Sequence, residues 1–377
     1  MNTTRYVSLD ILRGLAIAIM IMGNLSPDTN YTMPQLLHKD WEGLTLLDMA
    51  FPSFVFTMGV SMVFSKGLSG TGWFRKMLRR TIILFLLGLL LNHLPGLLNV
   101  LAHTDYSLSQ YLTDITASYR PFGVLQRLAL VYFISTIIYK IMPHRLLLWT
   151  LAFSLMIFST VAYHLYNGAA PYSDLTNISM YVDQHTLGTA HTYLNQPFDP
   201  EGLWGTINAT ATALIGMIVG LTLKNNPVSI FAKNKIHKKL FTTGLFLLIT
   251  GYLWSYVEIV SKPLWTAPYV LTVTGIDVMV LAFVEARSDS RFFQALLHPF
   301  KAIGQNPLFI YLLTEIGVAL MYTISSHGEP LYTWLYHHYV FVATNAFATT
   351  FLYTMIWLII CLVVAEILYA KDIVIKL

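Results

Sequence analysis

The sequence contains few charged residues for its size. Only 11% of its 377 residues are Asp, Glu, Lys or Arg, and 55% are hydrophobic, whereas a soluble domain carries about 25% charged residues. This shortage excludes an ordinary soluble globular protein. The apolar runs are about 20 residues long, the length with which an α-helix crosses a bilayer and too long for membrane β-strands. We therefore expect an all-α fold, a polytopic transmembrane helix bundle in contact with lipid.

Cysteine is almost absent, since Cys361 is the only one in the chain. A single cysteine excludes an internal disulfide, and its position in an apolar run favours a small core residue over a catalytic one. The histidines between the apolar runs show no spacing typical of metal ligands, and the adjacent His337 and His338 would point apart on a helix. We therefore expect no metal site.

Ten apolar runs are candidate membrane spans, within what we expect to be a single domain over residues 1–377. The first run has no small-residue cleavage site, so we interpret it as a retained helix and not as a signal peptide. The sixth is rich in small and hydroxylated residues, which suit close packing between helices. The expected spans are 7–25, 45–65, 78–98, 121–141, 145–166, 203–223, 239–259, 266–286, 302–323 and 346–369.

Lysine and arginine are distributed unevenly over the segments between these spans. Of the 23 in the chain, Lys39, Arg120 and Lys262 fall on one side, Arg127 lies within a span, and the others fall on the side of the N-terminus. Because cytoplasmic segments are enriched in Lys and Arg, this bias predicts that both termini are cytoplasmic. It also explains the net charge of +4 without nucleic-acid binding.

Ionisable and amide side chains occur within the expected spans, where they are costly and therefore indicate function. Asp10, Arg13 and Asn24 share one stripe of the first span at helical spacing, although an inner-edge ion pair would explain Asp10 and Arg13 equally well. Asp48 begins a polar face on the second span. Arg127 lies in the fourth span, and a buried arginine needs a partner of opposite charge. Asp48, Asp277 or a ligand phosphate are the candidates. Together these residues predict a polar passage, which an enzyme and a transporter would share.

Six stretches of the chain, in order, resemble the heparan-alpha-glucosaminide N-acetyltransferase family of membrane acyltransferases and their bacterial relatives. The match runs over essentially the whole chain. The stretches are SLDILRGLAIAIMIMGN (8–24), HKDWEGLTLLDMAFPSFVFTMGVS (38–61), GVLQRLALVYF (123–133), FDPEGLWGTINA (198–209), LWTAPYVLTVTG (264–275) and HPFKAIGQNPLFIYLL (298–313).

This resemblance implies acetyl-CoA as the co-substrate on the cytoplasmic side and an amino sugar on the far side, with the acetyl group alone crossing the membrane. The family's reacting histidine lies in an H-x-x-W-x-G-L-T motif, which matches His38, Trp41, Gly43, Leu44 and Thr45, and its asparagine at the end of the first span matches Asn24. The segment between Asn24 and His38 is longer here than in the lysosomal enzyme. The chain also lacks that enzyme's N-terminal luminal region, so we expect a compact bacterial form in the inner membrane, acting as a homodimer.

The chemistry of acetyl transfer assigns expected roles to these residues. His38 is expected to accept the proton of the attacking amine, Asn24 to bind the developing oxyanion and Asp48 to orient the imidazole. Direct transfer and transfer through an acetylated His38 both remain open. We expect residues on the outer side to bind the acceptor, and residues on the inner side to bind the phosphates of acetyl-CoA. The substrate set is Trp41, Glu42, Asp199 and Glu201, and the cofactor set is Asp10, Arg13, Arg127, Gln305 and Asn306.

Two other functions fit parts of the same pattern. An O-acyltransferase that decorates a cell-surface glycan would use the same motifs on a hydroxyl acceptor. A transporter would use the polar passage without chemistry, but it gives no reason for the H-x-x-W-x-G motif. The outer acidic residues, taken alone, are explained as well by the exclusion of positive charge as by attraction of a cationic amine.

Overall fold

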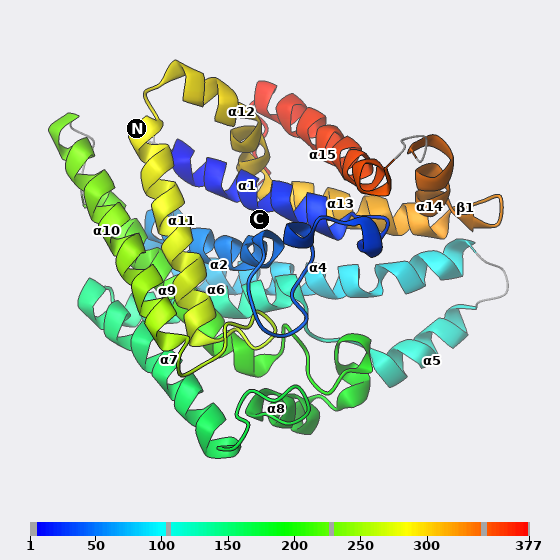
Figure 1. Cartoon of the computed structure of the whole chain (residues 1–377), viewed down its shortest axis with the longest axis horizontal. Coiled ribbons are helices and arrows are strands. Elements are labelled where there is room, and N and C mark those ends of the chain that lie inside the picture. Colours follow the sequence, from blue (N-terminus) through cyan, green and yellow to red (C-terminus); the bar gives the residue numbers. More distant parts are fainter. Residues whose placement is uncertain (1–5, 103–106, 226–229, 341–344, 376–377) are drawn as a thin grey trace.

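The computed structural model describes residues 6–102, 107–225, 230–340 and 345–375, and these form an almost entirely helical bundle (Figure 1). The helices are α1 (Val7–Asn24), α2 (Leu46–Phe64), α3 (Lys66–Ser69), α4 (Trp73–Ala102), α5 (Leu108–Ser118), α6 (Val124–Ile141), α7 (Arg145–Tyr166), α8 (Ile178–Thr186), α9 (Leu203–Lys224), α10 (Ile230–Trp254), α11 (Ala267–Arg287), α12 (Arg291–Gln305), α13 (Pro307–Thr323), α14 (Leu331–Leu335) and α15 (Ala346–Ala370). The strands are β1 (Ser325–Ser326) and β2 (Glu329–Pro330), which pair antiparallel. The expected all-α polytopic fold is confirmed.

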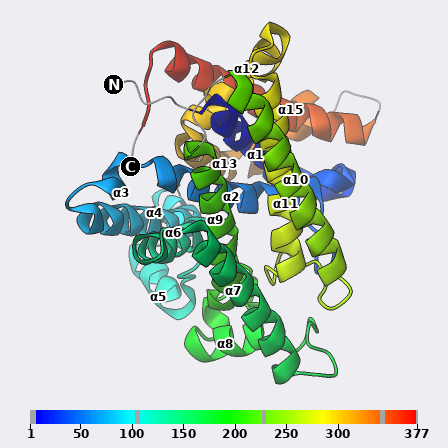
Figure 2. The same ribbon diagram turned by 90° about the vertical axis from the view of Figure 1, so that its left-hand side faces the viewer.

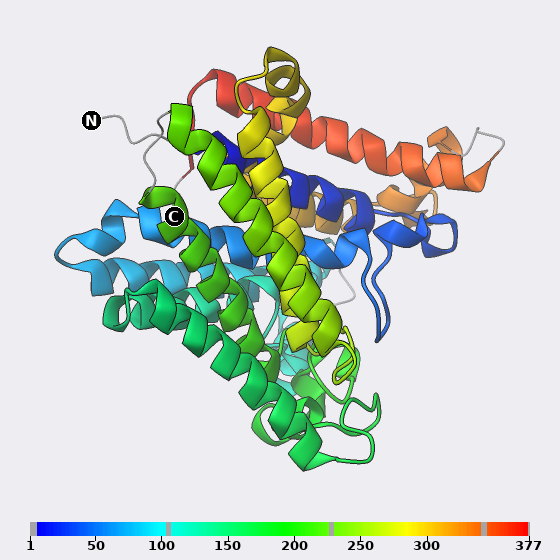
Figure 3. The ribbon, with the colours of Figure 1, turned by 60° about the vertical axis from the view of Figure 1, so that its left-hand side comes forward.

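The centre of the bundle is formed by α2 and α9, which are the most buried of the apolar helices. Their backbones approach closely because glycines face the partner helix: a Cβ on Gly59 would collide with the carbonyl oxygen of Ala213, and one on Gly216 with that of Phe56. The small residues of the sixth expected span therefore do serve close packing, as predicted. Around this pair, α10 and α11 lie side by side along one flank, and α15 lies along another edge (Figure 3).

Eight of the described helices are long and apolar enough to cross a membrane. The expected span 302–323 is not one straight helix, because the chain bends by 76° between α12 and α13. Asn306 leaves helical geometry there, and Pro307, which lacks an N–H, starts a new helix. This bent pair would make a ninth span. The run 239–259 falls on α10, whose apolar part is preceded by Lys238 and Lys239 and which is not among the eight.

The short helices α5, α8 and α14 lie where outer loops were expected, whereas α3 lies in an expected inner segment. Figure 2 shows α8 beside the end of α7, beyond the long helices of the bundle. The loop between α1 and α2 contains short 3₁₀ turns at Thr29–Tyr31 and Pro34–Leu36. The expected cytoplasmic ends, residues 1–5 and 376–377, lie outside the described residues.

Candidate functional site

A cavity of about 830 Å³ runs through the bundle beside α1 and α2. Its lining includes Arg13, in the first half of α1, and Asn24, the last residue of that helix. It also includes His38, which precedes α2, and Ser61, near the end of α2. Because the lining contains residues from both ends of α1 and α2, the cavity reaches both ends of these helices. We call the end at Arg13 and Ser61 the inner end and the end at Asn24 and His38 the outer end, after the orientation expected from the charges.

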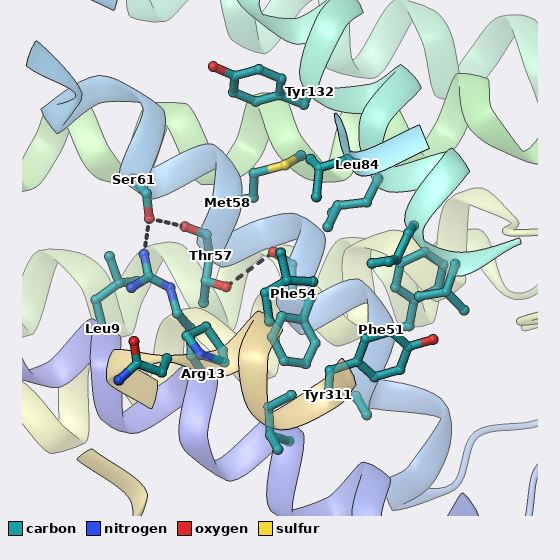
Figure 4. Close-up of a pocket in the computed structure, with 18 of the residues that line it drawn as sticks. Leu9, Arg13, Phe51, Phe54, Thr57, Met58, Ser61, Leu84, Tyr132 and Tyr311 are labelled. Carbon is teal, nitrogen blue, oxygen red and sulfur yellow. Dashed lines mark hydrogen bonds between the residues drawn. The ribbon is translucent and has the colours of Figure 1, made fainter. Parts of the chain in front are cut away.

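The inner end of the cavity gathers most of the residues expected to bind the cofactor. The Arg13 guanidinium donates to Oδ1 of the buried Asp10 at 3.0 Å and contacts the hydroxyl of Ser61 (Figure 4). Gln305 and Asn306 line the same end, at the break between α12 and α13. Lys66 and Arg80 line it as well, so positive charge is concentrated here.

Asn306 also has a structural role at this end. Its Nδ2 donates to the carbonyl oxygen of Ile373 at 2.9 Å, and its Oδ1 accepts from the N–H of Ile375 at 2.8 Å. The side chain therefore attaches the segment after α15 to the break in the bent helix pair, and Ile375 itself lines the cavity.

The middle of the cavity is mainly apolar. Phe51, Phe54, Met58 and Leu84 line it, together with Tyr311 of α13 (Figure 4). The hydroxyl groups on this face of α2 bond within the helix, since Ser61 donates to the carbonyl oxygen of Thr57 at 2.5 Å. The middle segment thus suits an uncharged, slender group better than an ion.

At the outer end the structure brings His38 and Asp48 into contact, and Asn24, the last residue of α1, lines the same cavity as His38. Nδ1 of the exposed His38 lies 2.8 Å from Oδ1 of Asp48, which is fully buried. Oδ2 of Asp48 accepts from the backbone N–H groups of Lys39 and Thr45 at 3.2 and 3.1 Å. A carboxylate held by so many donors can accept from Nδ1–H, which leaves Nε2 of His38 as the basic ring nitrogen. Asn24 and His38 both line the cavity.

The residues around His38 in the H-x-x-W-x-G-L-T motif fix the loop that carries it. Trp41 donates from Nε1 to the carbonyl oxygen of Tyr172 at 2.9 Å and packs edge-on against Phe198. Gly43 has φ +113°, a conformation that other residues rarely adopt, and its N–H donates to the carbonyl oxygen of Val260 at 2.7 Å. Thr45 and Asp48 form the capping box that begins α2. These residues position the histidine through the backbone.

Lys262, in the loop between α10 and α11, completes the outer end and was not singled out by sequence reasoning. Its Nζ lies 2.8 Å from Nδ1 and 3.0 Å from Nε2 of His38, and 3.7 Å from Oδ1 of Asp48. Burial lowers the pKa of the Lys262 ammonium, although the carboxylates of Glu201 and Asp48 oppose this shift. The one available signal was the charge distribution, in which Lys262 is one of the few outer cations.

A second outer cation, Arg120, engages two of the residues expected to bind substrate. It donates from Nε and Nη2 to the two carboxylate oxygens of Asp199 at 2.7 and 2.6 Å, and from Nη2 to Glu201 at 2.6 Å. These carboxylates raise the pKa of the Arg120 guanidinium. Asp199 is fully buried, whereas Glu201 lines the cavity. Of this pair, Glu201 is therefore the one that faces the passage.

Arg127 lies apart from the residues expected to share its function. It is buried, donates from Nη2 to the carbonyl oxygen of Gly202 at 3.0 Å, and stacks on the ring of Trp265. Neither expected carboxylate is its partner in the described chain, because Asp48 binds His38 and Asp277 accepts from Ser53 at 2.7 Å. The guanidinium lies at the start of α9, beside Gly202 and Gly205.

Two further expectations concern the loop surface and metals. Glu42 is exposed on the loop that carries His38, next to the partly buried Trp41. Among the residues that the structure describes, no group of three or more His, Cys, Asp or Glu side chains is placed to hold a metal ion.

Comparison with known proteins shows which family the chain resembles. Residues 5–170 match the family model described as heparan-alpha-glucosaminide N-acetyltransferase, catalytic, and this range contains Asn24, His38 and Asp48. The chain is 24% identical over 376 residues to heparan-alpha-glucosaminide N-acetyltransferase of Mus musculus, and 24% identical over 373 residues to that of Homo sapiens. These alignments cover 84% and 83% of this chain but 54% and 53% of the relatives, so the chain spans about half the length of the curated relatives it matches.

Both relatives are named as N-acetyltransferases, which supports an acyltransferase. The resemblance seen in the motifs is thus confirmed: the chain is similar to the catalytic part of this family over residues 5–170 and, at low identity, to two N-acetyltransferases over most of its length.

Proposed function

We propose that this protein is a transmembrane N-acetyltransferase that moves the acetyl group of cytoplasmic acetyl-CoA to the amine of an amino sugar on the opposite face of the membrane. The observation that carries this proposal is the cavity with cations at its inner end and the His38–Asp48 pair at its outer end. In a bacterial cell this arrangement fits the inner membrane, with the Lys- and Arg-rich segments in the cytoplasm and the acceptor in the periplasm.

The inner end has the charge that the donor requires. The phosphates of acetyl-CoA are anionic, and Arg13, Lys66 and Arg80 supply donors of opposite charge around the opening. Asp10 orients the Arg13 guanidinium from the helix turn below it. The apolar middle of the cavity suits the slender acyl-bearing arm of the donor, which carries no charge.

At the outer end the residues can perform the proton transfer. Nε2 of His38 accepts a proton from the attacking amine, while Asp48 fixes the ring through Nδ1. The Asn24 amide can donate to the oxygen of the thioester carbonyl as negative charge develops there. Glu201 supplies a carboxylate that can bind the cationic form of the acceptor before it loses its proton. The same residues would serve transfer through an acetyl-imidazole on His38.

The test is acetyl transfer across a sealed membrane. The protein is reconstituted into vesicles with radiolabelled acetyl-CoA on one side and glucosamine on the other, and His38→Ala is compared with the control Asp40→Asn, an exposed carboxylate on the same loop. We expect labelled N-acetylglucosamine from the wild type and the control, and none from His38→Ala with acetyl-CoA binding retained. If the protein acetylates a hydroxyl of a surface glycan and not glucosamine, the acceptor is that glycan and the O-acyltransferase alternative is correct. A chain that does not bind acetyl-CoA would contradict the proposal and favour a transporter.

A further inference from the structure

The position next to the basic nitrogen of His38 already contains an amine. Nζ of Lys262 lies 2.8 Å from Nδ1 and 3.0 Å from Nε2 of His38. Because the Asp48 carboxylate can only accept, Nδ1 carries the proton of that contact, and Nε2 is the ring nitrogen that can accept from the lysine. Lys262 lines the same cavity as Asn24 and His38. In this structure the lysine therefore occupies the place that the amine of an acceptor must take to lose its proton to His38.

The loop around Lys262 holds the amine at this position. The loop that contains Lys262 is tied to the loop of His38 through the hydrogen bond from Gly43 to Val260, and the lysine side chain is only 17% exposed. Burial lowers the pKa of its ammonium, so the neutral amine, which is the nucleophilic form, is more accessible than on an exposed lysine. A positioned base, an oxyanion donor and a desolvated amine are thus present together without any added acceptor.

We propose that Lys262 is a self-acetylation site, which takes the acetyl group when no acceptor amine occupies the outer end. The inference rests on the proposed function, because it uses the same donor and the same base. The Lys262 ammonium first loses a proton to solvent. Nζ then forms a bond to the acetyl carbonyl carbon, the carbon–sulfur bond breaks, His38 takes the second proton from Nζ, and this proton passes to the departing thiolate. The products are Nε-acetyl-lysine and the free thiol of CoA.

The modification would act as an off-switch for the site. Acetylation removes the positive charge beside Asp48 and Glu201, and the added group fills the place of the acceptor. The new amide is stable, unlike an acetyl-imidazole, so the acetyl group would not be passed on. Acceptor binding would protect the enzyme by displacing Lys262 from His38.

The experiment uses the purified full-length protein with acetyl-CoA labelled in the acetyl group, first without any acceptor and then with glucosamine. CoA thiol release, hydroxylamine-resistant label and peptide mass spectra are recorded for the wild type, Lys262→Arg, His38→Ala and the matched control Lys39→Arg. Thermal unfolding of each variant verifies that it is folded. Lys39, exposed on the neighbouring loop, reports uncatalysed acetylation.

We expect one stable acetyl group per chain, on Lys262, in the wild type and in Lys39→Arg. It should disappear in Lys262→Arg, form about 100-fold more slowly in His38→Ala because the base is lost, and decrease when glucosamine is present. Acetylated glucosamine without modification of Lys262 would overturn the inference and leave the proposed function intact. Equal labelling of Lys262 in His38→Ala would also overturn it, by showing uncatalysed chemistry. An absence of CoA release under both conditions would overturn the function and the inference together.

Discussion

The imidazole of His38 and the carboxylate of Asp48 meet at 2.8 Å, and this contact joins an exposed side chain to one that is fully buried. The buried partner is fixed by backbone donors from Lys39 and Thr45, so it has one orientation. The exposed partner is held in that orientation, and its other ring nitrogen, Nε2, lies beside Lys262 at the outer end of the cavity. The pair has the geometry of a general base with an orienting acid.

Replacing either member of this pair should suppress acetyl transfer. His38→Ala removes the base and Asp48→Asn presents an amide that can donate to Nδ1, which favours the wrong tautomer. We expect kcat to decrease by about 100-fold or more in each variant. Initial rates of transfer to glucosamine, with acetyl-CoA binding as a second readout, test this. Asp40→Asn should retain the wild-type rate, and a fully active Asp48→Asn would remove Asp48 from the mechanism.

This pair was within reach of the sequence, because both residues lie in one short segment. The pattern from Thr45 to Asp48 predicts a helix start, and His38 precedes it by a short loop, so the two side chains had to be near each other. The apolar runs similarly predicted most of the helices. Both inferences depend on residues that are close in the chain.

The contacts that were missed join distant segments. Lys262 is separated from His38 by 224 positions, and Arg120 from Asp199 by 79. A sequence shows that each residue is charged, but the pairing is decided by which loops the packed helices bring together. Arg127 illustrates the same limit, since its partner is the backbone carbonyl of Gly202, which no side-chain pattern marks.

Arg120 should contribute strongly to stability because it neutralises a buried carboxylate. Arg120→Gln leaves Asp199 buried without its counterion, which costs about 3–5 kcal/mol in free energy of unfolding. Adding Asp199→Asn should recover part of the loss, because the uncompensated charge is then gone. Unfolding of the purified variants by heat or denaturant measures both effects. The exposed Arg291→Gln serves as control and should change stability by about 0.5 kcal/mol or less; a similar result for Arg120→Gln would mean that the ion pair is replaced by solvent.

The crossing of α1 and α12 should not tolerate a methyl group. A Cβ on Gly304 would collide with the carbonyl oxygen of Asp10, and one on Gly14 with that of Phe300, so neither backbone can yield without moving the other. We expect Gly304→Ala to lower the unfolding temperature clearly and to weaken acetyl-CoA binding, since Asp10 holds Arg13 at the inner end. Gly317→Ala is the matched control, because its nearest neighbour is a ring atom of Trp357 at 3.7 Å. A helical alanine there should be neutral or stabilising by about 1 kcal/mol, and equal effects of the two substitutions would contradict the close crossing.

Glu258 should make the stability of the protein depend on pH. It lies in the loop before α11, is 1% exposed, and accepts a hydrogen bond from Thr160 at 2.7 Å. Burial raises the pKa of its carboxyl from 4.5 to about 7. The folded protein therefore holds this proton more tightly than the unfolded chain does. The contribution to stability is complete below the unfolded pKa of 4.5 and is lost as the pH rises through the folded value of about 7.

Glu258→Gln removes this titration while keeping a similar shape. At pH 4 the variant and the wild type should have similar free energies of unfolding, whereas at pH 8 the variant should be more stable, by up to about 3 kcal/mol. Burial also raises the pKa of Asp183, to about 6, but this residue titrates in both proteins and its effect cancels in the difference. Unfolding temperatures of Glu258→Gln and of the exposed control Asp174→Asn, measured from pH 4 to pH 8, test the prediction. If the difference in unfolding temperature between Glu258→Gln and the wild type stays constant from pH 4 to pH 8, the prediction is wrong. Glu258 would then ionise in the folded protein at the same pH as in the unfolded chain, with its unpaired Oε1 solvated within the loop.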